Sequence, residues 1–95
     1  MSDAHNPRIT ITYCYQCHWL LRAGWMAHGL LSTFSGDLGE VSLVPATGGT
    51  FQIHYDGHLL WDRKRDGGFP DARTLKQRVR DSLDPERDLG HIDRT

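Results

Sequence analysis

Residues 9–31 read ITITYCYQCHWLLRAGWMAHGLL, and in this stretch a strand pattern runs directly into a helix pattern. Large apolar residues alternate with threonine over residues 9–13, which is typical of a half-buried strand. A proline-free helical pattern begins at Tyr15 or Cys17 and reaches about Phe34. Its apolar residues recur at helical spacing, at Leu20, Ala23, Ala27, Leu30, Leu31 and Phe34. We therefore expect a strand that passes into a long helix.

Both cysteines of the chain, Cys14 and Cys17, lie at this junction and form a CxxC motif. If they occupy the first turn of the helix, their Cβ atoms are about 5–6 Å apart and a disulfide can form with small rotamer changes. The positive end of the helix dipole favours an anion there and lowers a thiol pKa from about 8.5 toward neutrality. In a reducing compartment, one CxxC motif indicates redox or metal chemistry more often than a structural bridge. Two buried cysteines without a function are the alternative.

Length and charge exclude several classes of protein. A chain of 95 residues forms one domain, because two separate cores would each bury too little apolar surface. The formal net charge is −1 and the one basic run, residues 63–65, is short, so we expect no nucleic-acid partner. No apolar run approaches the ~18 residues that span a bilayer, and the first eight residues lack a secretory pattern. We therefore expect a cytoplasmic protein with no membrane contact.

The remaining chain predicts three further strands and a second helix. A strand, a long helix and another strand make a crossover unit, so the first two strands should be parallel. The pair Asp56-Gly57 fits a two-residue type I′ turn between the last two strands, and Asp71 offers a cap for the second helix. A loop is expected over residues 63–70. The strands and the helix are expected at residues 40–44, 50–55, 58–62 and 71–83.

The predicted order is strand, helix, strand, strand, strand, helix. This β-α-β-β-β-α order indicates an α/β protein of the two-layer α+β kind, with a four-stranded mixed sheet and both helices on one face. It is the minimal thioredoxin-like fold, in which a CxxC motif stands between the first strand and the first helix. The expected divisions are a disordered N-terminus (1–8), a thioredoxin-like domain (9–83) and a flexible C-terminal tail (84–95).

Several segments of this domain resemble one known family. They are the strand and CxxC motif of residues 11–17, the segment TGGTF at 47–51, the turn at Asp56-Gly57, and LWDRK at 60–64, which leads to GGFP at 67–70. In these segments the chain resembles the selenoprotein W, T and H family, the Rdx group, and specifically its bacterial selenium-free members. Proteins of that group are regarded as thiol or selenol oxidoreductases, so the resemblance implies that Cys14 and Cys17 are catalytic. Selenocysteine occupies the position of Cys17 in the selenium-containing relatives, which implies a slower reaction here.

The loop after the second strand departs from classical thioredoxins. Thioredoxins have a cis-proline there that faces the cysteines, whereas this chain has Thr47, Gly48 and Gly49. Residues 45–49 are also too few to form the helix that thioredoxins place between these strands. The mode of substrate binding must therefore differ. Candidate binding residues are those beside the cysteines and in this loop, namely Tyr15, Gln16, His18, Thr47, Gly48 and Gly49.

The register of the predicted hairpin suggests a second binding surface. With a two-residue turn, Tyr55 pairs with His58 and His54 with Leu59, so Leu59 and Trp61 share one face of the sheet. If both helices cover the other face, this one is bare. We predict that Leu59 and Trp61 form a small apolar patch on it for a partner or a second copy. Ordinary exposure, or cover by the tail, is the alternative.

Two kinds of bound group compete with redox chemistry. The sequence Cys14-x-x-Cys17-His18 also matches the haem c attachment motif, but that chemistry needs export and a second axial ligand, and Met26 on the same helix could not supply it. A zinc site could use both cysteines and His18, yet no second CxxC or HxxxH completes it at a standard spacing. We therefore expect no cofactor and no metal.

The sequence favours thiol–disulfide exchange through Cys14 and Cys17, with protein thiols, protein disulfides or glutathione as partners. Thioredoxin chemistry would make Cys14 the attacking thiolate, whereas the family resemblance favours Cys17, which we prefer. A protein-binding module that is switched by its disulfide and turns over little is the alternative. We expect a monomer or a weak homodimer. The basic run at 63–65 could steer an acidic partner or stabilise a thiolate if its loop folds back toward the motif.

Overall fold

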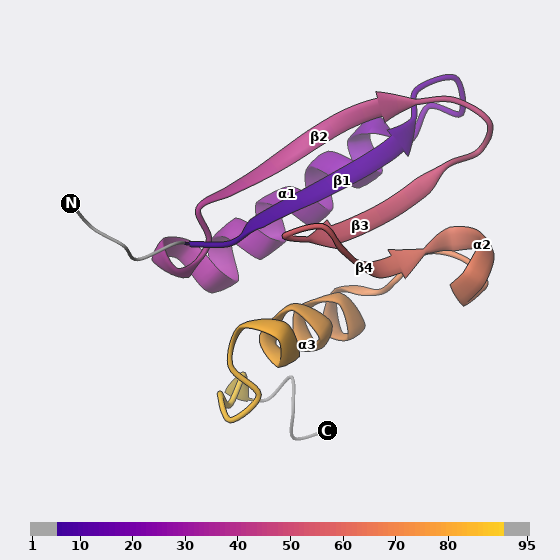
Figure 1. Cartoon of the computed structure of the whole chain (residues 1–95). Coiled ribbons are helices and arrows are strands. Elements are labelled where there is room, and N and C mark those ends of the chain that lie inside the picture. The colour runs from indigo at the N-terminus through magenta and orange to yellow at the C-terminus, as the bar shows by residue number, and fades with distance from the viewer. Residues whose placement is uncertain (1–5, 91–95) are drawn as a thin grey trace.

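The computed structural model describes residues 6–90, and their elements follow the predicted order with two short helices added (Figure 1). In chain order the elements are β1 (Arg8–Cys14), α1 (Leu20–Phe34), the short 3-10 helix η1 (Ser35–Asp37), β2 (Glu40–Ala46), β3 (Phe51–Tyr55), β4 (His58–Asp62), α2 (Arg63–Asp66) and α3 (Ala72–Leu83). The outer parts of the predicted N-terminal segment and tail, residues 1–5 and 91–95, lie outside the described residues.

The strands form one mixed sheet in the order β2-β1-β3-β4. β1 and β2 are parallel, as expected for strands that a helix connects, and β3 pairs antiparallel with both β1 and β4. Asp56 and Gly57 join β3 to β4 with φ angles of 49° and 91°, and positive values at both residues are the requirement of the predicted type I′ turn. The predicted fold class is confirmed.

The edge strand β2 runs two residues beyond its predicted end at Val44, through Pro45 to Ala46. The carbonyl of Ala46 accepts a hydrogen bond from the backbone N–H of Tyr15 at 2.9 Å, so alternate residues of β2 direct their backbone groups toward β1. Pro45 lies between Val44 and Ala46, so its nitrogen faces away from β1, toward the free edge of the sheet. The missing N–H therefore costs no hydrogen bond within the sheet, which explains why a proline is tolerated here.

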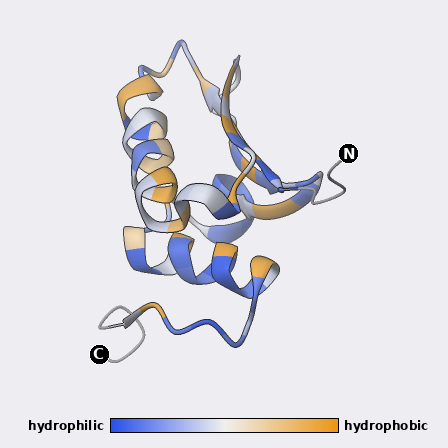
Figure 2. Cartoon of the chain, turned by 90° about the vertical axis from the view of Figure 1, so that its left-hand side faces the viewer, coloured by the Kyte–Doolittle hydropathy of each residue, from blue (hydrophilic) through white to orange (hydrophobic). Residues whose placement is uncertain are grey.

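The core lies between one face of the sheet and the two longer helices. Alternate residues of β1 and β3 are fully buried, and α1 and α3 contribute apolar residues to the same cluster. Figure 2 shows both helices on the same side of the sheet, as predicted. The opposite face carries half-buried polar residues such as Thr10, Thr12 and Gln52. The largest fully buried side chains are Phe34, Phe51, Ile9, Ile11, Leu30, Ile53 and Val79.

The predicted apolar patch of Leu59 and Trp61 is wrong. The hairpin register is as predicted next to the turn, but a β-bulge shifts it, so that Ile53 pairs with Trp61 and Leu60 becomes the extra residue. Trp61 therefore turns to the core, where it is 8% exposed and lies under the guanidinium of Arg78 of α3 at 4.6 Å. Leu59 stays on the other face and is partly exposed.

The predicted loop at residues 63–70 begins with the short helix α2, whose C-terminal cap, Gly67, has a φ of 79°. α2 also helps to accommodate the bulge. The carbonyl of Leu60, the extra residue, accepts hydrogen bonds from Arg65 at 3.1 Å and from Arg78 at 2.7 Å. Two arginines thus satisfy a carbonyl that the irregular strand pairing leaves without a regular ladder position.

The predicted cap of the second helix is confirmed. The carboxylate of Asp71 accepts the backbone N–H of Thr74 at 2.7 Å, and this bond is the main reason that the pKa of Asp71 is lowered. After α3, Arg87 forms an ion pair with Asp37 and lies over the ring of Phe34 at 5.5 Å, so the first part of the predicted tail contacts the end of α1. Across residues 6–90, no helix has the length and apolar character needed to cross a membrane.

Candidate redox site

The two cysteines are joined by a disulfide at the end of β1. Cys14 is the last residue of β1, and Cys17 lies in the turn that follows, with a Cα–Cα separation of 5.3 Å, inside the range that disulfides require. The prediction that both cysteines occupy the first turn of the helix is wrong, because α1 begins at Leu20. A tight turn, rather than helical spacing, brings the two sulfur atoms together.

Local hydrogen bonds fix this turn. Tyr15 is tied to the end of β2 through its N–H, and its carbonyl accepts the N–H of His18 at 3.2 Å. His18 has a φ of 63°, in the left-handed region that residues other than glycine rarely adopt, and this reverses the chain before the helix. Trp19 then stands at the N-cap of α1 without a side-chain cap. The turn therefore delays the start of the helix beyond the cysteines.

The two sulfur-bearing side chains differ in exposure. Cys14 is 1% exposed, whereas Cys17 is partly exposed. The predicted binding residues Tyr15, Gln16 and His18 are exposed around Cys17. A molecule that approaches from solvent can therefore reach the Cys17 side of the disulfide first.

The loop after β2, residues 47–50, lies beside the CxxC turn because Cys14 pairs with Ala46 across the parallel strands. The predicted binding residues Thr47, Gly48 and Gly49 are thus brought to the motif. The other two, Leu59 and Trp61, are in β4, which lies two strands away from β1. Gly48 and Gly49 have φ angles of 70° and 72°. These positive angles favour glycine at both positions.

Two basic side chains of α2 contact this loop. Arg63 donates from Nε and Nη2 to the carbonyl of Gly49, at 3.1 Å each, and Lys64 donates from Nζ to the carbonyl of Gly48 at 3.4 Å. The first two residues of the basic run therefore do fold back toward the motif. Sequence reasoning had no means of assigning them a carbonyl partner, because the partners lie 14 and 16 residues away in the chain.

An aromatic cluster lies at the other end of the CxxC turn. The ring of Trp19 meets those of Phe51 and Phe69 edge-on, with centroid separations of 6.2 and 4.9 Å, and Phe51 meets Phe69 at 4.9 Å. Two guanidinium groups flank the cluster, that of Arg22 over Phe69 at 4.1 Å and that of Arg63 over Trp19 at 5.1 Å. The residue two positions after Cys17 is thereby anchored to the sheet.

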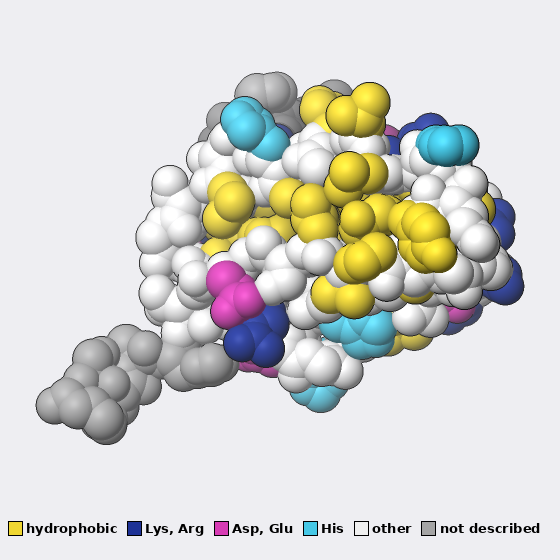
Figure 3. Space-filling model, turned by 90° about the horizontal axis from the view of Figure 1, so that it is seen from above, with side chains coloured by type: hydrophobic (Ala, Val, Ile, Leu, Met, Phe, Trp, Pro, Cys, Tyr) yellow, Lys and Arg dark blue, Asp and Glu magenta, His cyan; other side chains and the backbone are white. Residues whose placement is uncertain are grey.

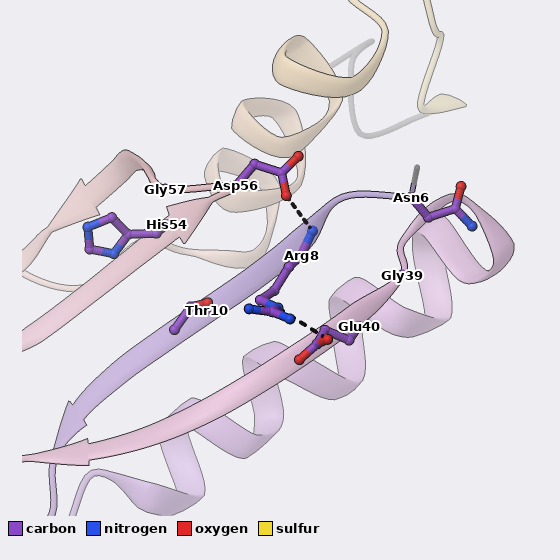
Figure 4. A pocket seen from close by; sticks show the side chains of 8 residues that line it. All are labelled: Asn6, Arg8, Thr10, Gly39, Glu40, His54, Asp56 and Gly57. Atoms are coloured by element: carbon purple, nitrogen blue, oxygen red, sulfur yellow. Dashed lines mark hydrogen bonds and ion pairs between the residues drawn. The ribbon is translucent and has the colours of Figure 1, made fainter. Parts of the chain in front are cut away.

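A large hollow lies elsewhere, at the opposite end of β1 (Figure 4). Its volume is about 770 Å³, and polar side chains line it. Some of these groups bind each other. The guanidinium of Arg8 forms an ion pair with Glu40 at 3.1 Å, and the backbone N–H of Arg8 donates to the carboxylate of Asp56 at 2.9 Å. A hydrogen bond from Ser42, and then the charge of Arg8, lower the pKa of Glu40. The hollow is separate from the cysteines, so we place the candidate site at the CxxC end.

Metal binding has no ready ligand set in the described part of the chain. Among residues 6–90, no three or more histidine, cysteine or acidic side chains are grouped so that they could hold a metal ion. What the site does contain is one reactive unit, a disulfide between the buried Cys14 and the partly exposed Cys17. This unit can accept two electrons and two protons to become a dithiol.

The fold and the site together define a small α+β protein with a CxxC disulfide at the end of its first strand. The sequence model of the Rdx family matches residues 8–81, and the chain belongs to the Rdx family.

Two solved structures illustrate the relationship. A crystal structure of a protein from Bordetella parapertussis is 71% identical, with a TM-score of 0.82, and the match covers 83% of this chain and 100% of that one. A selenoprotein W-related protein from Vibrio cholerae is 50% identical, with a TM-score of 0.82, over 84% of this chain and 100% of that one. A search of the curated proteins finds no significant match.

Proposed function

We propose that this protein is a thiol–disulfide oxidoreductase in which Cys14 and Cys17 alternate between a dithiol and a disulfide. The observation that carries the proposal is the disulfide itself, formed across a tight turn between the buried Cys14 and the partly exposed Cys17. Membership of the Rdx family supports a redox role. The proposed partners are protein thiols and disulfides, or glutathione, in the reducing cytoplasm.

The exchange proceeds in two steps. The thiolate of Cys17 attacks a partner disulfide, so that one partner sulfur leaves as a thiolate and takes up a proton, and a mixed disulfide with Cys17 remains. Cys14 then loses its proton and attacks the Cys17 sulfur, which releases the second partner sulfur as a thiol and forms the Cys14–Cys17 disulfide. The partner gains two electrons and two protons, and this protein loses them. An external thiol reverses both steps.

The difference in exposure supports Cys17 as the attacking residue. Cys14 is buried at the end of β1, so a bulky disulfide cannot approach its sulfur in line, whereas Cys17 lies in the exposed turn. Cys14 is well placed for the second step, since its Cα lies 5.3 Å from that of Cys17. This assignment agrees with the position of selenocysteine in the selenium-containing relatives.

Single-cysteine variants test the assignment. Incubated with a disulfide that releases a coloured thiol, Cys14→Ser should form a stable mixed disulfide at Cys17, identified by peptide mass. Cys17→Ser should react much more slowly, because its remaining thiol is buried. The wild type should release both partner thiols and end as the internal disulfide. Equal rates for the two variants, or a stable adduct on the wild type, would contradict the proposed steps.

A second candidate function is a binding module whose association depends on the state of the disulfide. It is favoured by the apolar side chains exposed near the motif and along the free edge of β2, where Figure 3 shows hydrophobic side chains gathered. Tyr15, inside the CxxC turn, is 54% exposed, and Leu20, at the start of α1, is 50% exposed. Exposed apolar groups that cluster on one surface often mark contacts with a partner.

Turnover separates the two candidates. Sub-stoichiometric protein, supplied with excess dithiol, should reduce many equivalents of a protein disulfide if it is an oxidoreductase. A single equivalent reduced per chain, with no further turnover in excess dithiol, would favour the binding module.

A further inference from the structure

Arg63 contacts both the loop after β2 and the residue at the end of the CxxC turn. It is the first residue of α2, and both Nε and Nη2 donate to one carbonyl, that of Gly49, at 3.1 Å each. The same guanidinium lies over the indole ring of Trp19, with its carbon 5.1 Å from the ring centroid. One side chain thus joins three segments that are far apart in the sequence: the CxxC turn, the loop after β2, and α2.

These contacts complete a frame around the two cysteines. The turn is held at its start by the hydrogen bond from Tyr15 to Ala46, the residue that precedes the loop 47–50. It is held at its end by Trp19, which packs on Phe51 and Phe69 and lies beneath Arg63. None of these contacts uses a sulfur atom. They can therefore persist in the dithiol, after the S–S bond opens.

We propose that Arg63 is a positioning residue that holds the CxxC turn closed in the dithiol form and so sets the equilibrium between dithiol and disulfide. This inference rests on the proposed function. The equilibrium depends on the effective concentration of one thiol at the other, and a turn fixed at both ends keeps that concentration high after the S–S bond opens. Loss of the Arg63 contacts should let the end of the turn move, which favours the dithiol.

The chemistry of the contact demands arginine. A guanidinium can direct two N–H groups at one carbonyl while its flat face lies on an aromatic ring, whereas an ammonium carries a compact charge without a planar fork. Gly49 is matched to this contact, because a Cβ at that position would lie 3.1 Å from Nη2 of Arg63. A lysine in place of Arg63 would keep the positive charge but lose this contact, so the two roles predict different results for that variant.

The test is the equilibrium of the full chain with reduced and oxidised glutathione, with the dithiol and disulfide forms separated by alkylation and mass. We expect Arg63→Met to shift the equilibrium constant about tenfold toward the dithiol, which is about 30 mV for a two-electron couple. Arg63→Lys should shift it in the same direction, since lysine keeps the charge but loses the fork. The control is Arg73→Met, which removes an exposed guanidinium from α3.

Each outcome decides one question. A wild-type equilibrium constant in Arg63→Lys would overturn the positioning role, because the positive charge alone would then explain the effect of Arg63→Met. Equal constants for Arg63→Met and Arg73→Met would also overturn it, while leaving the proposed function intact. If the wild type itself fails to reach a reversible equilibrium with glutathione, the proposed function fails instead.

A second variant covers the case in which Arg63→Met does not fold. Trp19→Phe keeps an aromatic ring in the cluster but weakens its attraction for the guanidinium, so we expect a shift of about two- to threefold toward the dithiol. An unchanged constant in folded Trp19→Phe would overturn the proposal. If Arg63→Met does fold, the double variant Arg63→Met/Trp19→Phe should shift the equilibrium no further than Arg63→Met alone. Additive shifts of the two substitutions would contradict a shared contact.

Discussion

Reduction of the Cys14–Cys17 disulfide should lower the stability of the native fold by a modest, calculable amount. The bridge closes a loop of four residues, counted from a sequence separation of 3. The loss of loop entropy in the unfolded chain, about 2.1 + 1.5R ln 4 cal/mol/K, corresponds to about 1.9 kcal/mol at 25 °C. Because the Cα–Cα separation is ordinary for a disulfide, we add no correction for the native state.

This stability difference is linked to the redox chemistry by a thermodynamic cycle. If the disulfide stabilises the fold by about 1.9 kcal/mol, the fold favours the disulfide by about twentyfold over the unfolded chain. If the cysteine pair is to exchange readily between dithiol and disulfide, the oxidised protein should be only slightly more stable to unfolding than the reduced protein. A large value would indicate a structural bridge that resists reduction.

Urea unfolding followed by far-ultraviolet circular dichroism measures the difference, with and without excess reductant. For a urea slope of about 1–3 kcal/mol/M, the midpoint should fall by roughly 0.6–1.9 M on reduction. The double variant Cys14→Ser/Cys17→Ser serves as the control and should not respond to reductant. Equal stability of the oxidised and reduced forms, or a more stable reduced form, would refute the claim that the native turn holds the two sulfur atoms together.

Three further predictions concern the frame of the site and the fold. Phe51→Leu should cost about 1–3 kcal/mol more than Phe34→Leu in urea unfolding, because Phe51 loses two edge-on ring partners whereas Phe34 has none among residues 6–90; equal costs would contradict this. Gly57→Ala should destabilise the protein by about 1 kcal/mol or more, since its φ of 91° disfavours a side chain, and an unchanged melting temperature would argue against the type I′ turn. The lowered pKa of Asp71 means that its bond to Thr74 stabilises the fold fully above the ordinary value of about 3.9, and that this contribution disappears as the pH falls through the lower folded value. The difference in melting temperature between wild type and Asp71→Ala should therefore be constant at neutral pH and shrink below about pH 4; a difference that does not change with pH would show that the carboxylate charge is not involved.

Local chemistry was enough to predict most of the fold. The alternation over residues 9–13 and the proline-free apolar pattern up to Phe34 encode a strand and a helix at short range. Asp56-Gly57 encodes its turn because few residue pairs tolerate two positive φ angles. Asp71 encodes a helix start because its side chain can accept a backbone N–H three residues away. Each of these signals involves residues within a few positions of one another.

The parts that sequence reasoning missed depend on distant contacts. The bulge in β4 changes one register step, so Leu60 becomes an extra residue and Trp61 turns inward to meet Arg78, which lies 17 positions further along the chain. The helix α2 is too short to show periodicity, and its basic residues bind carbonyls of Gly48 and Gly49. No local pattern reports such pairings.

The candidate site was predicted in part. The two cysteines and the loop of residues 47–49 are close together because parallel strands end at the same edge of the sheet. The start of α1 was predicted too early, since the disulfide-linked turn and the positive φ of His18 take residues that the apolar pattern assigned to the helix. The role of Arg63 could not be predicted, because its partners are a backbone carbonyl and a ring from two other segments.

A redox titration of the full chain, followed by intact mass, tests the central claim most directly. The protein is equilibrated with glutathione mixtures of increasing oxidising strength, its free thiols are trapped, and its intact mass is measured by mass spectrometry. The account predicts a reversible transition in which the chain loses one pair of hydrogens, with the new bond mapped to Cys14 and Cys17 and absent from either single serine variant. A mass that stays at the dithiol value throughout, or a stable glutathione adduct in place of the internal bond, would contradict it.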